Sequence, residues 1–248
     1  MRHEPPTAYA RDLAYVHHDA FGHLARDAAP VVLGALRRVG LRRGLIVDLG
    51  CGSGILARAL TEAGYDVLGV DLSPDMLRLA ARNAPRATFR RGSLLDMDFP
   101  PCVAVTAIGE PFNYVFDPRS TPAALSRLFR GIHGALEPGG FLLSDVAGPG
   151  RIGQGQVRQT FWDRPDWNLY LRAEENRAGT RLTRDIVLFR RIGSRYRRSE
   201  EHHTLRLYPP AAITERLTGA GFQVRRLRGY VPSRLRDSWP VYLARKPR

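Results

Sequence analysis

The chain has 248 residues, and 44% of them are hydrophobic, which suffices for the core of one α/β domain with an elaboration. No apolar run reaches about 18 residues, so no transmembrane helix is expected. The net charge of +14 comes almost wholly from arginine, and because Lys246 is the only lysine, a P-loop of the Gly-Lys-Ser/Thr type is excluded.

The excess of arginine has two interpretations, a genome-wide bias toward Arg codons or an anionic partner such as nucleic acid. The basic residues are scattered along the chain, without a dense basic tail or interleaved aromatic residues, so nucleic acid is a less favoured partner that stays open. Residues 1–6 lack the apolar segment of a signal peptide, and Cys51 and Cys102 are too few for a disulfide framework. We therefore expect a cytoplasmic protein without a membrane partner.

The first 43 residues are predicted to be helical. Apolar residues recur at helical spacing between residues 12 and 26, which indicates a first helix. Proline favours the first turn of a helix and glycine ends helices, so we expect a second helix to begin at Pro30 and to end at Gly40.

Strands and helices then alternate. Ser73 and Thr121 each stand before a proline and are predicted to cap helices. This rhythm predicts a doubly wound, mostly parallel sheet with helices on both faces. The expected strands are residues 45–49, 66–70, 87–90, 102–108 and 141–146, and residues 137–140 are expected to form a turn.

The rhythm breaks after Asp145. Glycines between residues 148 and 155 indicate a loop, and an antiparallel meander is predicted in strands 167–174, 182–190 and 195–207. A helix to Gly219 and strands 222–227 and 241–245 complete the chain. The fold class is therefore α/β, with a seven-stranded, mostly parallel sheet and an antiparallel β insertion after strand five.

The turn after the first strand carries Gly50, Gly52 and Gly54, with Asp48 just before it. A dinucleotide-binding turn has the spacing G-x-G-x-x-G, whose third glycine would fall at Ile55. The observed spacing, with the acidic residue before it, favours S-adenosylmethionine over NAD.

Four ordered motifs resemble those of the class I S-adenosylmethionine-dependent methyltransferases: Val47–Gly54, Val70–Leu77, Gly92–Asp96 and Leu136–Gly140. The closing segments 220–222 and 241–246 also fit this family. The resemblance implies a Rossmann-like core over residues 44–150 and 209–248, with S-adenosylmethionine as cofactor and S-adenosylhomocysteine as its product. It also implies an N-terminal helical lid over residues 1–43, and residues 151–208 are expected to cover the acceptor site.

Each cofactor residue has an expected role. Gly50 and Gly52 lack a Cβ, so the backbone can approach the methionine part, and the carboxylate of Asp71 can accept hydrogen bonds from both ribose hydroxyls. Asp96 resembles the family residue that binds the adenine amino group, although Asp71 and Asp96 could also be solvated turn residues. The predicted cofactor-binding residues are Tyr15, Asp48, Gly50, Cys51, Gly52, Gly54, Asp71, Leu72, Met76, Leu95, Asp96 and Gly109.

The candidate catalytic groups are Glu110, His18, Asp145 and His202. Glu110 and Asp145 follow strands four and five, whose carboxyl ends are expected to face the acceptor. His18 lies in the expected lid, and His202 lies in the meander. His202 and His203 are adjacent on a strand and point apart, so they cannot readily chelate one metal, and we expect no metal site.

The leading hypothesis is a metal-independent methyltransferase that acts on a nitrogen or oxygen atom of a small molecule by direct in-line displacement. The alternatives are an RNA or protein methyltransferase, which the arginines would suit, and a non-catalytic sensor of the cofactor. The identity of the acceptor and the oligomeric state stay open.

Overall fold

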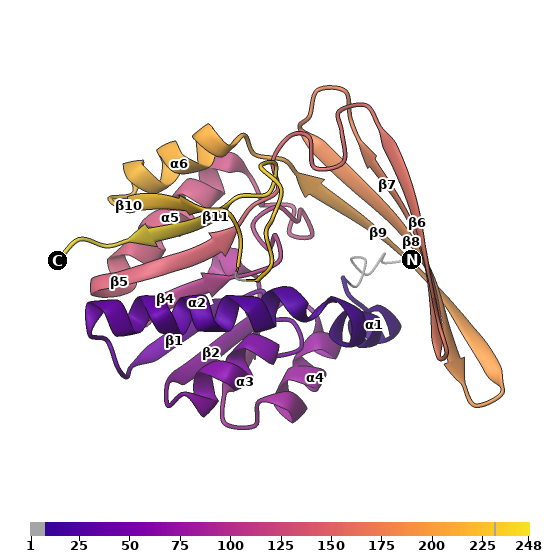
Figure 1. Ribbon diagram of the computed structural model, residues 1–248, viewed down its shortest axis with the longest axis horizontal. Coiled ribbons are helices and arrows are strands. Elements are labelled where there is room, and N and C mark those ends of the chain that lie inside the picture. The colour runs from indigo at the N-terminus through magenta and orange to yellow at the C-terminus, as the bar shows by residue number, and fades with distance from the viewer. Residues whose placement is uncertain (1–7, 231) are drawn as a thin grey trace.

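The computed structural model describes residues 8–230 and 232–248, so the first seven residues of the expected lid lie outside the described residues. Its central sheet has the strand order β10-β11-β5-β4-β1-β2-β3, in which β11 runs antiparallel to β5 and to β10 and the other pairs are parallel (Figure 1). The predicted fold class is confirmed. The strands are β1 (Leu45–Leu49), β2 (Asp66–Asp71), β3 (Thr88–Arg91), β4 (Cys102–Ala107), β5 (Leu136–Asp145), β10 (Gln223–Leu227) and β11 (Val241–Arg245).

Helices cover both faces of this sheet (Figure 1). One face packs against α2 (His23–Val39), α3 (Ile55–Glu62) and α4 (Pro74–Asn83), and the other against α5 (Pro122–Ala135) and α6 (Pro210–Gly219). Ile46 faces the first layer and Val47 the second, since successive side chains of a strand point to opposite faces. The predicted caps are present, because Ser73 accepts a hydrogen bond from the Met76 amide and Thr121 accepts one from the Ala124 amide.

The N-terminal helices differ from expectation. The helical segment is interrupted at Gly22, between α1 (Arg11–Phe21) and α2. The prediction that the second helix begins at Pro30 is therefore wrong. Pro30 lies inside α2 at an exposed position. Its nitrogen has no hydrogen to donate, so one helical hydrogen bond is missing, but the carbonyl left without a partner lies on the solvated side of the helix. Because α2 packs on the sheet, α1 and the segment before it are the part of this region that approaches the site.

Residues 137–140 were expected to form a turn, but they belong to the first half of β5. Gly139 has a positive φ of 82°, and the register with β4 shifts between Cys102 and Ala104. The irregular pairing explains why a Pro-Gly-Gly sequence is tolerated within the strand. A bulge interrupts the hydrogen bonding between the strands, so the proline need not donate a hydrogen bond there.

A second, antiparallel sheet stands beside the core (Figure 1). Its strands follow one another in the order β6 (Val157–Arg164), β7 (Trp167–Glu175), β8 (Arg181–Ile192) and β9 (Arg195–Arg206). The strand β6 was not expected from the sequence. As an edge strand with mostly exposed side chains, β6 carries little of the alternation that reveals a half-buried strand.

The second sheet docks on α1. Trp167 is fully buried with Leu13 and Val16 of α1, and its indole nitrogen donates to Asp19 over 3.0 Å. Asp12 also binds Arg197 of β9 through two hydrogen bonds of 2.6 and 2.5 Å. The N-terminal helix thereby joins the second sheet to the core. Within residues 8–230 and 232–248, no helix has the length and apolarity needed to cross a bilayer.

Phe129→Ala should lower the free energy of unfolding by about 3–5 kcal/mol, because the ring is fully buried and packs edge-to-face on Phe112. Urea denaturation followed by circular dichroism measures the change. The matched control is Phe161→Ala on β6, where the ring is 62% exposed and the effect should stay within about 0.5 kcal/mol. Equal losses in the two variants would contradict the assignment of the core.

Candidate functional site

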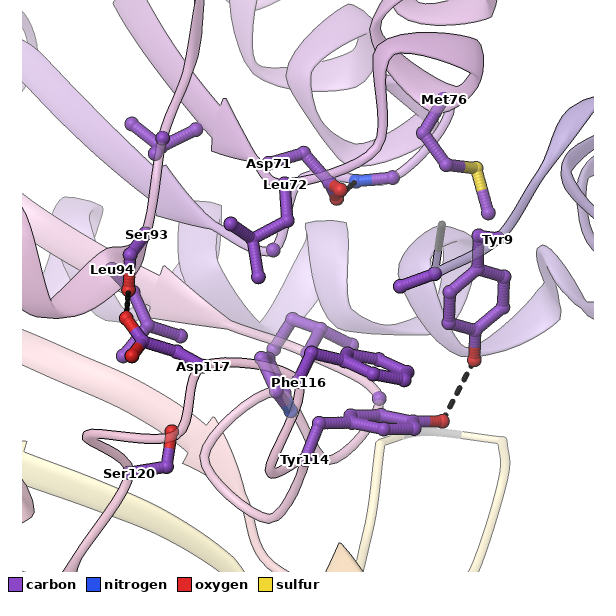
Figure 2. A pocket seen from close by; sticks show the side chains of 18 of the residues that line it. Tyr9, Asp71, Leu72, Met76, Ser93, Leu94, Tyr114, Phe116, Asp117 and Ser120 are labelled. Atoms are coloured by element: carbon purple, nitrogen blue, oxygen red, sulfur yellow. Dashed lines mark hydrogen bonds between the residues drawn. The ribbon is translucent and has the colours of Figure 1, made fainter. Parts of the chain in front are cut away.

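A pocket lies at the carboxyl ends of β1, β2 and β4, where the strand order reverses and ligands of such sheets bind (Figure 2). The glycine turn after β1 forms one wall, and Gly50 and Gly52 line it with positive φ values of 66° and 52°. A side chain at either position would be strained. Gly54 serves another purpose, since a Cβ there would lie 2.9 Å from the Cα of Ala80, so this glycine lets α3 pack against α4.

Asp71 couples the glycine turn to the end of β2. Its carboxylate accepts hydrogen bonds from the Gly52 amide over 2.9 Å and from the Ser73 amide over 2.8 Å. Burial raises the pKa of this carboxyl, although the amide donors oppose the shift. Leu72 and Met76 line the same side of the pocket (Figure 2). The arrangement places a carboxylate and two apolar side chains beside the glycine turn. Their role in binding the cofactor stays a prediction.

The opposite end of the pocket is formed by residues that sequence reasoning missed (Figure 2). Ser93 donates a hydrogen bond of 2.6 Å to Asp117, and Leu94 and Ser120 lie beside this pair. Phe116 stacks on a neighbouring tyrosine ring, with the centroids 4.8 Å apart. Asp117, Ser120 and Phe116 stand in an irregular loop after β4, where no periodic pattern marks their direction.

Asp96 and Leu95, which were expected at the adenine, do not line this pocket. Asp96 is exposed, and Arg119 donates to its two oxygens over 2.7 and 2.8 Å. These hydrogen bonds lower the pKa of Asp96. The Gly92–Asp96 motif therefore does contribute to the pocket, but through Ser93 and Leu94 rather than through its last two residues.

The predicted tyrosine is also displaced. Tyr15 donates to Asp166 over 2.7 Å and carries the guanidinium of Arg190 over its ring, so it faces the second sheet. Tyr9 lines the pocket instead, and its hydroxyl lies 2.7 Å from that of Tyr114 (Figure 2). Tyr9 precedes α1 and has a left-handed backbone with φ of 51°, so helical spacing could not have indicated it.

Asp48 and Cys51 lie close to the pocket without lining it. The Asp48 carboxylate accepts a hydrogen bond of 2.6 Å from Thr106 of β4, and burial raises its pKa to about 7. Burial also raises the pKa of the Cys51 thiol, which packs next to Gly69. These side chains stabilise the turn from behind.

A second cavity of about 370 Å³ opens beside the first, between the core and the second sheet. The two cavities share four wall residues, Tyr9, His17, Gly109 and Tyr114. The two cavities therefore adjoin at these four residues. The remaining lining of the second cavity includes Leu13, Phe21, Glu110, Arg151, Arg158, Trp162, Leu169, Leu171, Leu182, Arg184, Ile186, His203 and Trp239.

Of the four catalytic candidates, the structure brings Glu110 alone into this cavity. Glu110 is 2% exposed, has a left-handed backbone with φ of 67°, and accepts hydrogen bonds from Arg151 over 2.6 Å and from Arg184 over 2.7 Å. Burial alone would raise its pKa, but the two arginines outweigh burial and lower it. Glu110 is therefore an anion that holds two cations at the floor of the cavity.

Asp145 lies behind this floor. Its oxygens accept hydrogen bonds from the Gly109 and Glu110 amides, each over 2.8 Å, and from the side chains of Tyr230 and Trp239. Burial raises its pKa. With four donors on one carboxylate and no surface in either cavity, Asp145 fixes the backbone of the loop that carries Glu110.

The two predicted histidines point away from the cavities, and their neighbours point into them. His18 shares a hydrogen bond of 2.9 Å with Ser53, and His202 is exposed and pairs with Asp185 over 2.6 Å. His17 lines both cavities, and His203 lines the second one and pairs with Glu201 over 2.8 Å. The candidates from the sequence were His18 and His202, whereas the structure brings His17 and His203 to the cavities. Among the described residues, no cluster of three or more His, Cys, Asp or Glu side chains is placed to hold a metal ion.

The first cavity suits a nucleoside with an amino-acid tail. A Cβ at Gly109 or Gly92 would meet nothing within 4 Å, so the backbone there borders open space that a ligand can fill. The Asp71 carboxylate offers acceptors for ribose hydroxyls, and the Ser93–Asp117 pair offers polar groups at the other end. The expected cofactor, S-adenosylmethionine, is such a molecule, since it joins an adenine, a ribose and a methionine tail.

Comparisons with known proteins agree with this fit. The family model described as a methyltransferase domain matches residues 46–140. The Bacillus subtilis (strain 168) protein named "Putative methyltransferase YqeM" is 28% identical over 198 residues, which cover 75% of this chain and 76% of that protein. A ubiquinone biosynthesis O-methyltransferase of Methylococcus capsulatus is 40% identical over 89 residues, which cover 33% of this chain and 37% of that protein.

Solved structures resemble the whole chain. An S-adenosylmethionine-dependent methyltransferase from Clostridium acetobutylicum ATCC 824 aligns with a TM-score of 0.80 and 17% identity, over 95% of this chain and 98% of the other. The sugar N-methyltransferase KedS8 from Streptoalloteichus sp ATCC 53650 aligns with a TM-score of 0.75 and 20% identity, over 100% of this chain and 96% of the other. At these identities the likeness shows the fold.

Asp71→Asn should weaken binding of S-adenosylhomocysteine by about 1.5–3 kcal/mol, because charge-assisted hydrogen bonds are lost while the size of the side chain is kept. Isothermal titration calorimetry measures the affinity. Asp96→Asn is the matched control and should leave it almost unchanged, since Asp96 pairs with Arg119 outside the pocket. A loss in the Asp96 variant equal to that in the Asp71 variant would show that the adenine end is misassigned.

His17 should make stability fall in acid. Burial, followed by the charge of Arg184, lowers the pKa of the folded imidazole to about 4 from the ordinary value of 6.5. Between these values the unfolded chain binds the proton and the folded chain does not, so stability present above pH 6.5 is lost as the pH falls toward 4. His17→Gln should remove up to roughly 3 kcal/mol of that loss, measured by urea unfolding at several pH values. Parallel pH curves for the two proteins would contradict a neutral His17 in the folded protein.

Proposed function

Because the chain belongs to the class I S-adenosylmethionine-dependent methyltransferases, we propose that it methylates a nitrogen or oxygen atom of a small molecule by direct in-line displacement without a metal ion. One observation carries the proposal: the pocket beside the glycine turn and the second cavity share four lining residues, Tyr9, His17, Gly109 and Tyr114. A methyl donor on one side of this wall and a nucleophile on the other would meet there.

The position of the second sheet supports a small acceptor. Leu169, Leu182 and Ile186 from its strands roof the second cavity, so a folded RNA or protein would have to displace this sheet to reach the shared wall. The names of the compared proteins agree, since they include a sugar N-methyltransferase, an amino pentose methyltransferase and ubiquinone O-methyltransferases. The cytoplasmic location expected from the two free cysteines stays a prediction.

The bound cofactor supplies an electrophilic methyl group on a sulfonium, so the protein needs to position the nucleophile, exclude water and accept any proton that leaves it. Gly50, Gly52 and Asp71 would hold the cofactor. His17 would accept a hydrogen bond from the nucleophile, because burial keeps its imidazole neutral at pH 7 and its ring lines both cavities. Since so low a pKa makes it a weak base, it would take the proton only as the methyl group moves and the nucleophile becomes acidic. His17 thus takes the role for which His18 was a candidate.

A panel of small amines, phenols and carboxylic acids, each supplied with S-adenosylmethionine, tests the function by mass detection of methylated product and S-adenosylhomocysteine. His17→Gln should lower the turnover number by about 10²-fold for an acceptor that loses a proton, with little change in cofactor affinity. His202→Gln, which removes an exposed histidine, is the matched control and should keep wild-type turnover.

Two outcomes would redirect the proposal. Cofactor binding without transfer to any acceptor would favour the sensor hypothesis. Transfer to RNA or protein but not to small molecules would favour the macromolecular one. Equal loss of turnover in both histidine variants would contradict the role of His17.

A further inference from the structure

The second cavity carries an excess of positive charge. Its acidic lining is Glu110, and that carboxylate is already bound by Arg151 and Arg184, while Arg158 of β6 adds a third guanidinium. The four groups together carry a charge of about +2 at neutral pH, since arginine stays protonated. A ligand with a negative charge would therefore gain energy on entering, and an ammonium ion would be repelled.

Arg151 is held in place before any ligand arrives. Its Nε donates to Glu110 over 2.6 Å, and its guanidinium lies 3.9 Å from the centre of the Trp239 ring. The side chain is 18% exposed and lines the cavity. Fixing a guanidinium on two sides removes rotamer freedom that a ligand would otherwise have to freeze, so the site is preorganised.

The two terminal nitrogens of Arg151 remain available. Among the described residues neither of them makes a hydrogen bond, whereas Arg184 spends both of its terminal nitrogens on Tyr114 and Glu110. Neither nitrogen is a fully buried atom without a partner, so both remain accessible on a side chain that lines the cavity. Such a pair of parallel donors matches the two oxygens of a carboxylate.

The wall formed by the second sheet is largely apolar. Leu169, Leu171, Leu182 and Ile186 face it from β7 and β8, and Trp162 closes it from β6. A hydrophobic wall opposite a fixed cation suits a molecule with an apolar body and one acidic group.

We propose that the methyl acceptor is an apolar carboxylic acid whose carboxylate binds the terminal nitrogens of Arg151. This inference rests on the proposed function, because it names the class of acceptor for the same cavity. The carboxylate anchors the molecule at the floor formed by Glu110 and Arg151, while the apolar body lies against the second sheet. The sequence showed only that arginine is abundant. Arg158 also lines the cavity without a hydrogen bond among the described residues, but Arg151 is the guanidinium that is held in place and still has free terminal donors.

Calorimetry on the protein saturated with S-adenosylhomocysteine tests this inference with three probes of similar shape. Naphthoate is the anion, naphthamide the neutral analogue and naphthylmethylammonium the cation. Naphthoate should bind at least about tenfold more tightly than naphthamide, and the ammonium should bind most weakly. Equal affinities, or no binding of naphthoate, would overturn the proposal.

Variants identify the anchor. Arg151→Gln should lower naphthoate affinity about tenfold or more and leave naphthamide affinity unchanged, and Arg151→Lys should restore part of the difference because it keeps the charge without the fork. Arg130→Gln on α5 removes the same charge at an exposed site and should change neither affinity. A preference for naphthoate that survives Arg151→Gln, in protein shown by thermal melting to be folded, would place the anchor elsewhere.

The failure of the proposed function would look different. Protein that does not bind S-adenosylhomocysteine would fail at the first titration, before any acceptor probe is added. Protein that binds it but shows no preference for the anion would refute the carboxylate inference alone.

Discussion

The site depends on one buried carboxylate. Glu110 follows β4, Arg151 follows β5 and Arg184 lies on β8, so the two ion pairs join three segments that are distant in sequence. Removing charges from water costs free energy, and buried pairs often repay little more than that cost, so these pairs are better understood as fixing geometry than as adding stability. Because Asp145 binds the Glu110 amide from behind, the backbone and the side chain of this residue are both held.

Tyr9 also connects segments that are distant in the sequence. The Tyr9 amide donates to Glu201 of β9, its carbonyl accepts from Ser73 at the start of α4, and its ring reaches Tyr114. The N-terminal segment, the core and the second sheet therefore meet at one residue. A chain with the core alone would keep the glycine turn, Asp71, Gly109 and Tyr114, but it would lack the roof and the two wall residues Tyr9 and His17.

What could be predicted from the sequence follows the range of the interactions involved. The turn of Gly50 and Gly52 and the carboxylate of Asp71 are determined by a strand, a turn and a helix that are contiguous in the chain, so their pattern is readable. The direction of a side chain relative to a second, distant segment cannot be predicted from such a local pattern. The helix that holds His17 and His18 was identified, but the docking of α1 on Trp167 decides which histidine faces the cavities.

Other misses have the same origin. Asp96 was assigned to the adenine because its motif ends there, yet Arg119 from the loop after β4 occupies its oxygens, and no local pattern marks that pairing. The edge strand β6 has a partner on one side only and alternates weakly. In each instance a contact made after folding overrides the local preference.

The backbone of Tyr9 is held by hydrogen bonds to Glu201 and Ser73, and its side chain lines both cavities. Any substitution that reshapes this side chain therefore alters the lining of both cavities at once.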